Sequence, residues 1–160
     1  MALSWLLDTN VVSEMMRSQP DQRVIRLLST IPQQRVGLSS VTVWEILNGI
    51  GQLEPGRQRT DLAERFHSVL FGLEDRVLDW TIADARACAD IMEARRRLGR
   101  PLDAQLPDAL LAATAVRRGL TIITRNTRDF EGTGAQTVNP WEVAGSTSEG
   151  ASGLDGNAVD

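Results

Sequence analysis

Four acidic residues stand beside apolar runs that lie far apart in the chain. They are Asp8, Glu45, Asp108 and Asp129. Asp8 comes directly after the apolar run 5–7, and Asp108 comes directly before the run 109–113. In an open parallel sheet, the carboxyl ends of the strands line the crevice where ligands bind. Carboxylates that meet there repel one another unless a cation lies between them. The pattern therefore predicts a divalent-metal site suited to hydrolysis at a phosphate.

Each of these acids also has an ordinary structural explanation. Asp8 fits an Asx turn between a strand and a helix, and Glu45 fits a capping box with Thr42. Asp108 in a first helical turn is favoured by the helix dipole, and Asp129 fits a turn after a strand. No single acid is therefore specific for a metal site. Only the arrangement of all four acids can distinguish a metal site from these structural roles.

The apolar residues alternate between short strand patterns and longer helical ones. We expect strands at 4–7, 35–39, 76–78, 121–124 and 136–138. We expect helices at 20–31, 42–53, 57–73, 81–98 and 107–118, with a short helix after Asp8 and a cap at Gly119. Strands that alternate with helices indicate an α/β fold with a mainly parallel sheet.

Length and composition indicate one domain. The chain has 160 residues, of which 42% are hydrophobic and 24% charged, the balance of a soluble globular protein. We place the domain at residues 1–144 and expect the Gly/Ser/Asp-rich tail at 145–160 to be disordered. No apolar run could span a membrane, and the N-terminus lacks the pattern of a signal peptide. The single cysteine, Cys88, fits a reducing compartment, so we expect a cytoplasmic protein.

Several other kinds of active site are disfavoured by what the sequence lacks. One histidine, His67, and one cysteine make a zinc site implausible. There is no G-x-S-x-G elbow, no Walker A loop and no G-x-G-x-x-G fingerprint. We predict that His67 is a surface residue. The four tryptophans, Trp141 among them, are predicted to be core or interface anchors and not base-stacking platforms.

All 17 basic residues are arginines, and against 21 acids they leave a formal net charge of −4. Three of the acids and none of the arginines lie in the tail at 145–160. The arginines gather at 95–100, at 117–118, and at Arg125 and Arg128. Two interpretations stay open: solvated helix surfaces with basic C-terminal ends, or a rim that contacts phosphates beside an acidic centre.

The order of the motifs is more informative than any motif alone. LLDTNVVSE begins at residue 6, SSVTVWEI at 39, PDALLAATA at 107 and TRNTRDF at 124. In this order they resemble the PIN-domain family, and within it the VapC-like and FitB-like toxins of type II toxin–antitoxin systems. The closing segment GTGAQTVNPWE resembles the same subgroup. The resemblance covers roughly residues 3–142 and implies a three-layer α/β/α domain whose central sheet has about five strands, mainly parallel.

The resemblance also implies a chemistry. The family's metal-binding acids fall on Asp8, Glu45 and Asp108, which would bind Mg²⁺ or, alternatively, Mn²⁺. Many relatives have aspartate directly after Thr-Arg, where this chain has Asn126; Asp129 could supply the missing charge, and the number of metals stays open. The implied activity is that of an endoribonuclease toxin, in which Glu45 ligates or orients the attacking water as a general base.

Substrate and partners are implied in the same way. Residues expected to contact the RNA substrate or to complete its pocket are Thr9, Thr124, Arg125 and Asn126. The expected protein partners are a second copy of the chain in a homodimer and a cognate VapB-like antitoxin that lays a segment into the acidic groove. No membrane partner is expected.

Two other classes of function remain as alternatives. The first is a non-catalytic PIN-like module that binds or regulates a partner, and the asparagine at position 126 favours it. The second is a phosphohydrolase of small molecules. It is disfavoured because Asp8-Thr9-Asn10 lacks the second, closely spaced acid that an aspartyl-phosphate mechanism needs.

Overall fold

The computed structural model describes residues 2–102 and 105–142, so the end of the expected domain at 143–144 and the expected tail at 145–160 lie outside the described residues. The sheet has five strands: β1 (Trp5–Leu7), β2 (Val36–Ser39), β3 (Val77–Leu78), β4 (Thr121–Ile123) and β5 (Gln136–Val138). Their order is β3-β2-β1-β4-β5, and every pairing is parallel. The expected parallel five-stranded sheet is confirmed.

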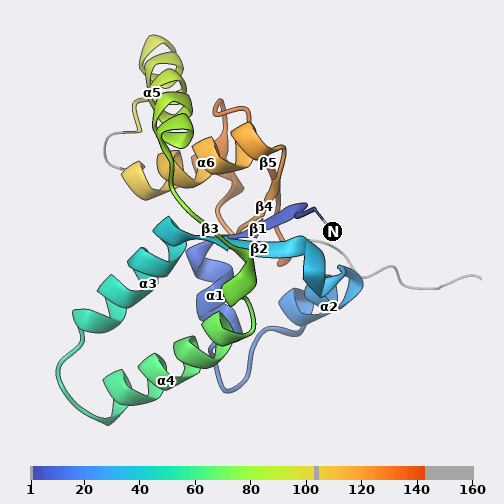
Figure 1. The fold of residues 1–160 in the computed structure, drawn as a ribbon, viewed down its shortest axis with the longest axis vertical. Helices are drawn as coiled ribbons and strands as arrows, with labels where there is room; N and C mark the ends of the chain where they lie inside the picture. The colour runs from blue at the N-terminus through green and yellow to red at the C-terminus, as the bar shows by residue number, and fades with distance from the viewer. Residues whose placement is uncertain (1, 103–104, 143–160) are drawn as a thin grey trace, which may run out of the picture.

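Helices cover both faces of this sheet (Figure 1). The described α-helices are α1 (Thr9–Met15), α2 (Gln22–Thr30), α3 (Ser40–Gly51), α4 (Arg57–Phe71), α5 (Ile82–Arg97) and α6 (Leu106–Arg118). Short 3-10 turns occupy η1 (Gln33–Arg35), η2 (Glu74–Arg76) and η4 (Thr127–Phe130). In Figure 1, α5 and α6 lie on one side of the sheet and α1, α2 and α4 lie on the other, which gives the expected three layers. Within the described ranges, no helix is both long and apolar enough to cross a membrane.

The two faces of the sheet bury two separate cores. Successive side chains of a strand point to opposite faces, so Leu6 and Leu7 of β1 enter different clusters. Leu6 packs in a cluster with Cys88 and Leu111, from α5 and α6. Leu7 packs in a cluster with Phe66 of α4 and with residues of α1 and α2. β1 is therefore fixed from both sides, and the position of its carboxyl end is well determined.

The ends of two helices test expectations made from the sequence. Gly119 ends α6 in the left-handed conformation, with φ +66°, as a C-terminal cap should. The capping box expected between Thr42 and Glu45 does not form. Ser39 caps α3 instead, while Thr42 is buried and its hydroxyl donates to the Leu7 carbonyl at 3.5 Å. Glu45 therefore lies in the second turn of α3, where its carboxylate is available for another role.

Candidate functional site

Asp8 and Thr124 meet at the carboxyl ends of two neighbouring strands. Leu7 of β1 lies opposite Ile123 of β4, so the residues that follow them are adjacent. The Thr124 hydroxyl donates to Oδ2 of Asp8 at 2.7 Å. The chain extends the sheet from β1 through β2 to β3, and then returns to place β4 and β5 on the other side of β1. The pair therefore lies at the topological switch point, where open α/β sheets bind ligands.

Asp8 is buried, and its carboxylate accepts hydrogen bonds from two further donors. It is the N-cap of α1: its Oδ1 accepts from the Thr9 backbone N–H at 2.7 Å. Its Oδ2 accepts from the Asn10 side-chain amide at 2.8 Å, in addition to the Thr124 hydroxyl. Burial raises the pKa of Asp8, these hydrogen bonds oppose that rise, and the charge of Asp129 adds to it. Asp8 therefore begins a helix and also has a fixed orientation at the switch point.

Glu45 is joined to the start of α1 by a side-chain contact. The Thr9 hydroxyl donates to Oε2 of Glu45 at 2.7 Å. Burial raises the pKa of Glu45, the hydrogen bond from Thr9 opposes that rise, and the nearby charge of Asp8 adds to it. Thr9 thus bonds Asp8 through its backbone and Glu45 through its side chain, which places both acids at one end of the sheet.

Asp108, in the first turn of α6, is the most perturbed acid of the group. Burial, followed by the charges of Asp8, Asp129 and Glu45, raises the pKa of Asp108 to about 7. No described residue forms a hydrogen bond or an ion pair with its carboxylate. The four acids singled out from the sequence therefore form one electrostatic group, and within the described residues Asp108 has no neutralising cation.

Asp129 is the fourth acid of this electrostatic group. This side chain lies in η4, half-buried, and its Oδ1 accepts from the Gln105 amide at 3.3 Å. Its negative charge contributes to the raised pKa of both Asp8 and Asp108. Asn126 is exposed and contributes its backbone N–H, which donates to the Thr124 hydroxyl oxygen at 3.0 Å. Asp129, three residues after Asn126, therefore brings a negative charge close to both acids, and its replacement of the aspartate that many relatives have at position 126 stays a prediction.

One residue of the site was missed from the sequence. The Asn10 side chain donates to Asp8, and its Oδ1 accepts the Arg125 backbone N–H at 3.0 Å. It therefore joins the end of β1 to the loop after β4. Only its place two residues after Asp8 pointed to it, and asparagine is too common in turns for that to be a signal.

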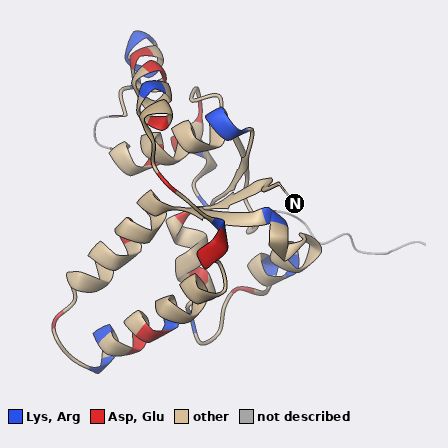
Figure 2. Cartoon of the chain, in the orientation of Figure 1, with Lys and Arg blue, Asp and Glu red and all other residues tan. Residues whose placement is uncertain are grey.

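The arginine clusters separate into two kinds. On α5, Arg96 and Arg97 both pair with Glu93, at 3.5 and 3.0 Å, and basic and acidic residues alternate along this helix (Figure 2). Arg96 and Arg97 therefore lie on a solvated helix surface, whereas Arg95 of the same cluster is buried and donates to the Glu131 carbonyl. Arg125 is different, because it is exposed immediately after Thr124 and lies 5.2 Å above the centre of the Trp141 ring. His67 is exposed on α4, as predicted.

The acids fit a hydrated ion better than a closed metal cage. Across residues 2–102 and 105–142, no three His, Cys, Asp or Glu side chains are arranged closely enough to hold an ion by themselves. Mg²⁺ binds through one or two carboxylates and keeps several waters. Asp8, with a fixed carboxylate, and Asp108, without a counter-charge, fit such a site.

Comparison with known proteins identifies the family. Residues 5–135 match the PIN domain. The chain belongs to the PIN-domain family. Among similar PIN proteins, VapC ribonuclease Y4jK of Sinorhizobium fredii is 35% identical over 140 residues, which cover 87% of this chain and 99% of that protein. Toxin FitB of Neisseria gonorrhoeae is 36% identical over 137 residues, covering 85% and 97%.

A solved structure supports the same assignment of fold. The crystal structure of FitAcB from Neisseria gonorrhoeae matches this PIN domain with a TM-score of 0.79 and 34% identity, covering 87% of this chain and 99% of that one. The fold and the family expected from the order of the motifs are therefore confirmed. The roles of individual acids in this PIN domain remain predictions.

Proposed function

We propose that this PIN-domain protein is the ribonuclease toxin of a type II toxin–antitoxin pair. It hydrolyses phosphodiester bonds of RNA with the help of a divalent metal that Asp8 and Asp108 would hold. The observation that carries the proposal is the buried group of acids at the switch point, where burial and then the charges of three other acids raise the pKa of Asp108 and no cation among the residues that the structure describes offsets them. The similarity to proteins named VapC ribonuclease and Toxin FitB supports RNA as the substrate and a toxin as the biological role.

The acids of the site have separate roles in the proposed reaction. Mg²⁺, or Mn²⁺ in its place, would be held by Asp8 and Asp108 and would supply charge neutralisation at the phosphate and a lower pKa for the attacking water. Asp8 enters this site already oriented by Thr9, Asn10 and Thr124, so little reorganisation is needed on binding. Glu45 uses Oε2 to accept from Thr9, which leaves Oε1 to orient the water and to take its proton as general base. Asp129 adds negative charge to the group, which would favour the binding of a cation.

Partners and location are part of the proposal. Trp44 and Leu47 on α3 are 55% and 54% exposed, and a second copy of the chain in a homodimer is the partner we propose for this apolar surface. A cognate VapB-like antitoxin would inhibit the toxin by laying a segment into the acidic groove. A basic side chain of that segment would replace the metal, charge for charge. The cytoplasm is the compartment in which such a pair meets its RNA.

A cleavage assay tests the enzyme assignment. The purified chain should cut single-stranded RNA with Mg²⁺ or Mn²⁺, lose this activity in EDTA, and recover it when the metal is restored. Asp108→Asn should abolish cleavage, whereas the matched control Asp90→Asn, an exposed acid on α5, should not. Cleavage that persists in EDTA would exclude the mechanism. Metal binding by calorimetry without any cleavage would favour the non-catalytic partner-binding module.

A further inference from the structure

The backbone of Arg125 is fixed by hydrogen bonds, whereas its guanidinium group is not hydrogen-bonded within the described residues. Its N–H donates to Asn10 Oδ1 and its carbonyl accepts from the Asn139 amide, both at 3.0 Å. Its exposed guanidinium lies over the Trp141 ring and makes no hydrogen bond or ion pair to any residue that the structure describes. Because Arg125 follows Thr124, which bonds Asp8, its backbone lies beside the acidic centre, and its free guanidinium lies near Asp21 at the rim of that centre.

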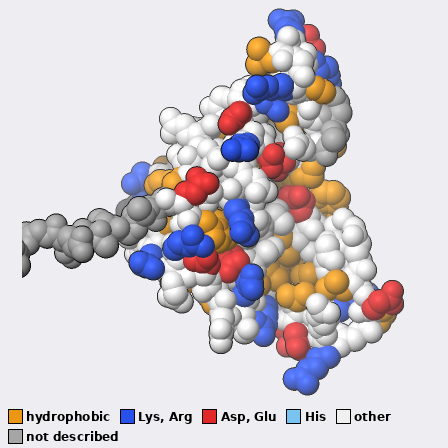
Figure 3. Space-filling model, turned by 180° about the vertical axis from the view of Figure 1, so that it is seen from behind, with side chains coloured by type: hydrophobic (Ala, Val, Ile, Leu, Met, Phe, Trp, Pro, Cys, Tyr) orange, Lys and Arg blue, Asp and Glu red, His pale blue; other side chains and the backbone are white. Residues whose placement is uncertain are grey.

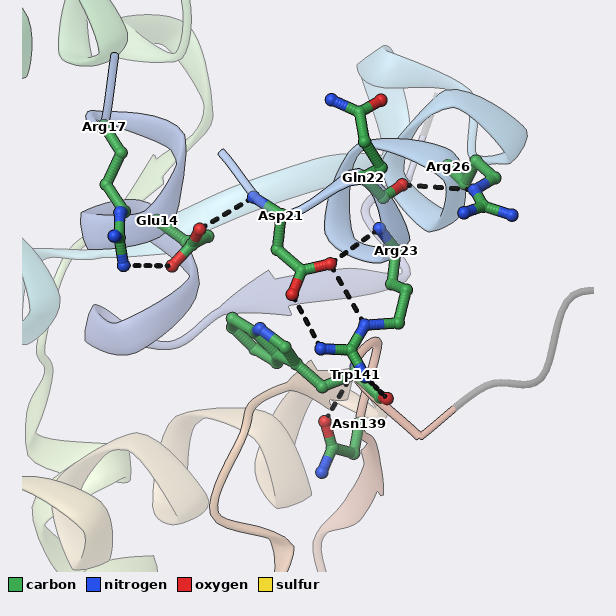
Figure 4. Close-up of polar contacts among 8 residues, drawn as sticks. All are labelled: Glu14, Arg17, Asp21, Gln22, Arg23, Arg26, Asn139 and Trp141. Carbon is green, nitrogen blue, oxygen red and sulfur yellow. Dashed lines mark hydrogen bonds and ion pairs between the residues drawn. The ribbon is translucent and has the colours of Figure 1, made fainter. Parts of the chain in front are cut away.

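Trp141 is itself held by a chain of polar contacts (Figure 4). Its backbone N–H donates to Asn139 Oδ1 at 3.0 Å, and its carbonyl accepts from the Arg23 guanidinium at 2.9 Å. Arg23 in turn makes two side-chain hydrogen bonds to the Asp21 carboxylate, at 2.7 and 3.1 Å. The Asp21 backbone N–H donates to the buried Glu14 at 2.7 Å. The residue under Arg125 is thus tied to both α1 and α2.

Among Asp21, Arg23 and Arg125, which lie around Trp141, only the Arg125 side chain has no hydrogen bond or ion pair within the described residues. Asp21 is near enough for its pKa to be lowered by Arg125, but Arg23 makes the dominant contribution and occupies its carboxylate. All three nitrogens of the Arg23 guanidinium are already bonded, to Asp21 and to Trp141. Figure 3 shows basic side chains, interspersed with acidic ones, beside the end of the described chain. Of the two guanidinium groups at Trp141, that of Arg125 is free to donate to an outside anion, whereas that of Arg23 is occupied.

A phosphodiester strand needs such a cation here. The four acids repel phosphate, so a strand that reaches the metal must be held by positive charge outside the acidic centre. A guanidinium that is stacked on an aromatic face keeps its edge N–H groups free for a bidentate contact with phosphate. Stacking also limits the side-chain freedom that is lost on binding.

We propose that Trp141 is a positioning residue that holds the Arg125 guanidinium at the rim of the acidic centre, where Arg125 binds a backbone phosphate of single-stranded RNA beside the one that is cut. This inference rests on the proposed function for its substrate class. It assigns Trp141 a role other than packing, although part of the ring also packs against the core that contains Leu7 and Ile123.

Binding in EDTA tests the inference without using catalysis. The probe is a fluorescein-labelled single-stranded RNA, and the variants are Arg125→Ala, Trp141→Leu, Trp141→Phe and the double variant Arg125→Ala/Trp141→Leu. Arg118→Ala is the matched control, because Arg118 is exposed at the other end of α6 from Asp108. Arg125→Ala should weaken binding about 5- to 10-fold and reduce the slope of log K against log salt by about 0.7, the value for one phosphate contact on a single strand.

The coupling between the two residues is the decisive readout. Trp141→Leu should lose most of the affinity and salt slope that Arg125→Ala loses, the double variant should be no weaker than Arg125→Ala, and Trp141→Phe should restore binding. Effects that multiply in the double variant, or an unchanged salt slope in Trp141→Leu, would overturn the proposal. Thermal melting checks that each variant is folded.

Arg125→Lys leaves Trp141 in place and keeps the positive charge. It should also bind RNA less tightly, because lysine lacks the planar fork of arginine. Wild-type binding by this variant would count against the stacked geometry.

Cleavage measured in parallel separates this inference from the proposed function. With Mg²⁺, Arg125→Ala and Trp141→Leu should raise KM and change kcat little. If the wild-type chain binds RNA with this coupling but does not cleave it, the proposed function fails and the inference stands. If the chain cleaves RNA and both variants have wild-type KM, the inference fails and the proposed function stands. No RNA binding by the wild-type chain overturns the inference.

Discussion

The hydroxyl of Thr124 donates a 2.7 Å hydrogen bond to Oδ2 of Asp8, across 116 residues of sequence. Both side chains are buried, and the same hydroxyl oxygen accepts the Asn126 backbone N–H at 3.0 Å. Thr124 thus joins the ends of β1 and β4 and also shapes the loop that carries Arg125. The orientation of Asp8 is set by the protein, before any ligand binds.

Thr124→Val should separate this role from packing. Valine keeps the shape of threonine but leaves the Asn126 N–H without its partner and removes one donor from Asp8. We expect a loss of about 1–3 kcal/mol in the free energy of unfolding, measured by urea denaturation, and lower cleavage activity. Thr124→Ser retains the hydroxyl and is the matched control. A valine variant as stable and as active as the serine variant would show that the bond is dispensable.

Asp108→Asn should stabilise the metal-free protein, and more so at high pH. Burial and three neighbouring acids raise the pKa of Asp108 to about 7, from about 3.9 in the unfolded chain. The folded state therefore holds more protons than the unfolded state between about pH 4 and pH 7, and wild-type stability falls as the pH rises through this window. After allowance for solvent screening we expect the variant to gain ~1 kcal/mol at pH 8. Melting in EDTA should show a gain of roughly 2–4 °C at pH 8 and almost none at pH 4.

Asp8→Asn is the contrasting variant for this experiment. Both donors to Oδ2, from Asn10 and Thr124, need an acceptor at that position, and an amide nitrogen there cannot accept. Removing the charge at Asp8 should therefore cost stability, although it too lowers the repulsion in the group. Equal gains in melting temperature for the two variants would mean that repulsion alone governs the site.

Thr9→Val should move the pH dependence of cleavage. The Thr9 hydroxyl lowers the pKa of Glu45, against the larger effect of burial, which raises it. Without the hydroxyl the pKa of Glu45 rises, so more of the base is protonated at a given pH. The acid limb of kcat/KM, measured from pH 5 to 9 with Mg²⁺, should shift to higher pH.

Glu45→Gln provides the control for the role of the base. It should lower kcat by about 10²–10⁴, the usual contribution of a general base, with a small effect on RNA binding. Thr9→Ser keeps the donor and should keep the wild-type pH profile. A Thr9→Val profile that coincides with the wild-type one would argue that Glu45 does not take the proton.

The parts of the site that follow strand ends could be predicted from the sequence, because local apolar patterns locate the strands and parallel strands end at one edge. Asp8 is of this kind, whereas Asp108 lies in the first turn of α6 and was singled out by the order of the motifs. The contact of Asn10 with the loop after β4 could not be predicted, because that loop lies more than a hundred residues away, and the stacking of Arg125 on Trp141 depends on side-chain placement that apolar patterns do not give. The capping box predicted from Thr42 and Glu45 was wrong for a related reason. Thr42 is buried in the folded protein, where its hydroxyl donates to the Leu7 carbonyl, and Ser39 is the N-cap of α3.

The ion pair between Arg117 and Asp84 should be the main polar support of the helix that carries Asp108. Arg117 Nε donates to Asp84 Oδ1 at 2.8 Å and joins α6 to α5, and the Asp84 side chain is completely buried. Burial raises the pKa of Asp84, but hydrogen bonds from Arg117 and Thr81 outweigh it, so the pKa is lowered overall. The pair therefore stabilises the fold above the unfolded pKa of about 3.9, and this stability is lost as the pH falls through the folded pKa.

Arg117→Met keeps the aliphatic packing of the side chain and leaves a buried carboxylate without its cation. We expect the free energy of unfolding at pH 7 to fall by about 2–4 kcal/mol, a little less than for a fully buried pair because Arg117 is 30% exposed on its side chain. The loss should shrink towards pH 3, where the Asp84 carboxylate of the variant is protonated. Urea denaturation at both pH values measures it, and Arg118→Met, on the neighbouring exposed residue, is the control. Equal losses at pH 7 and pH 3 would show that arginine packing, and not its charge, supports α6.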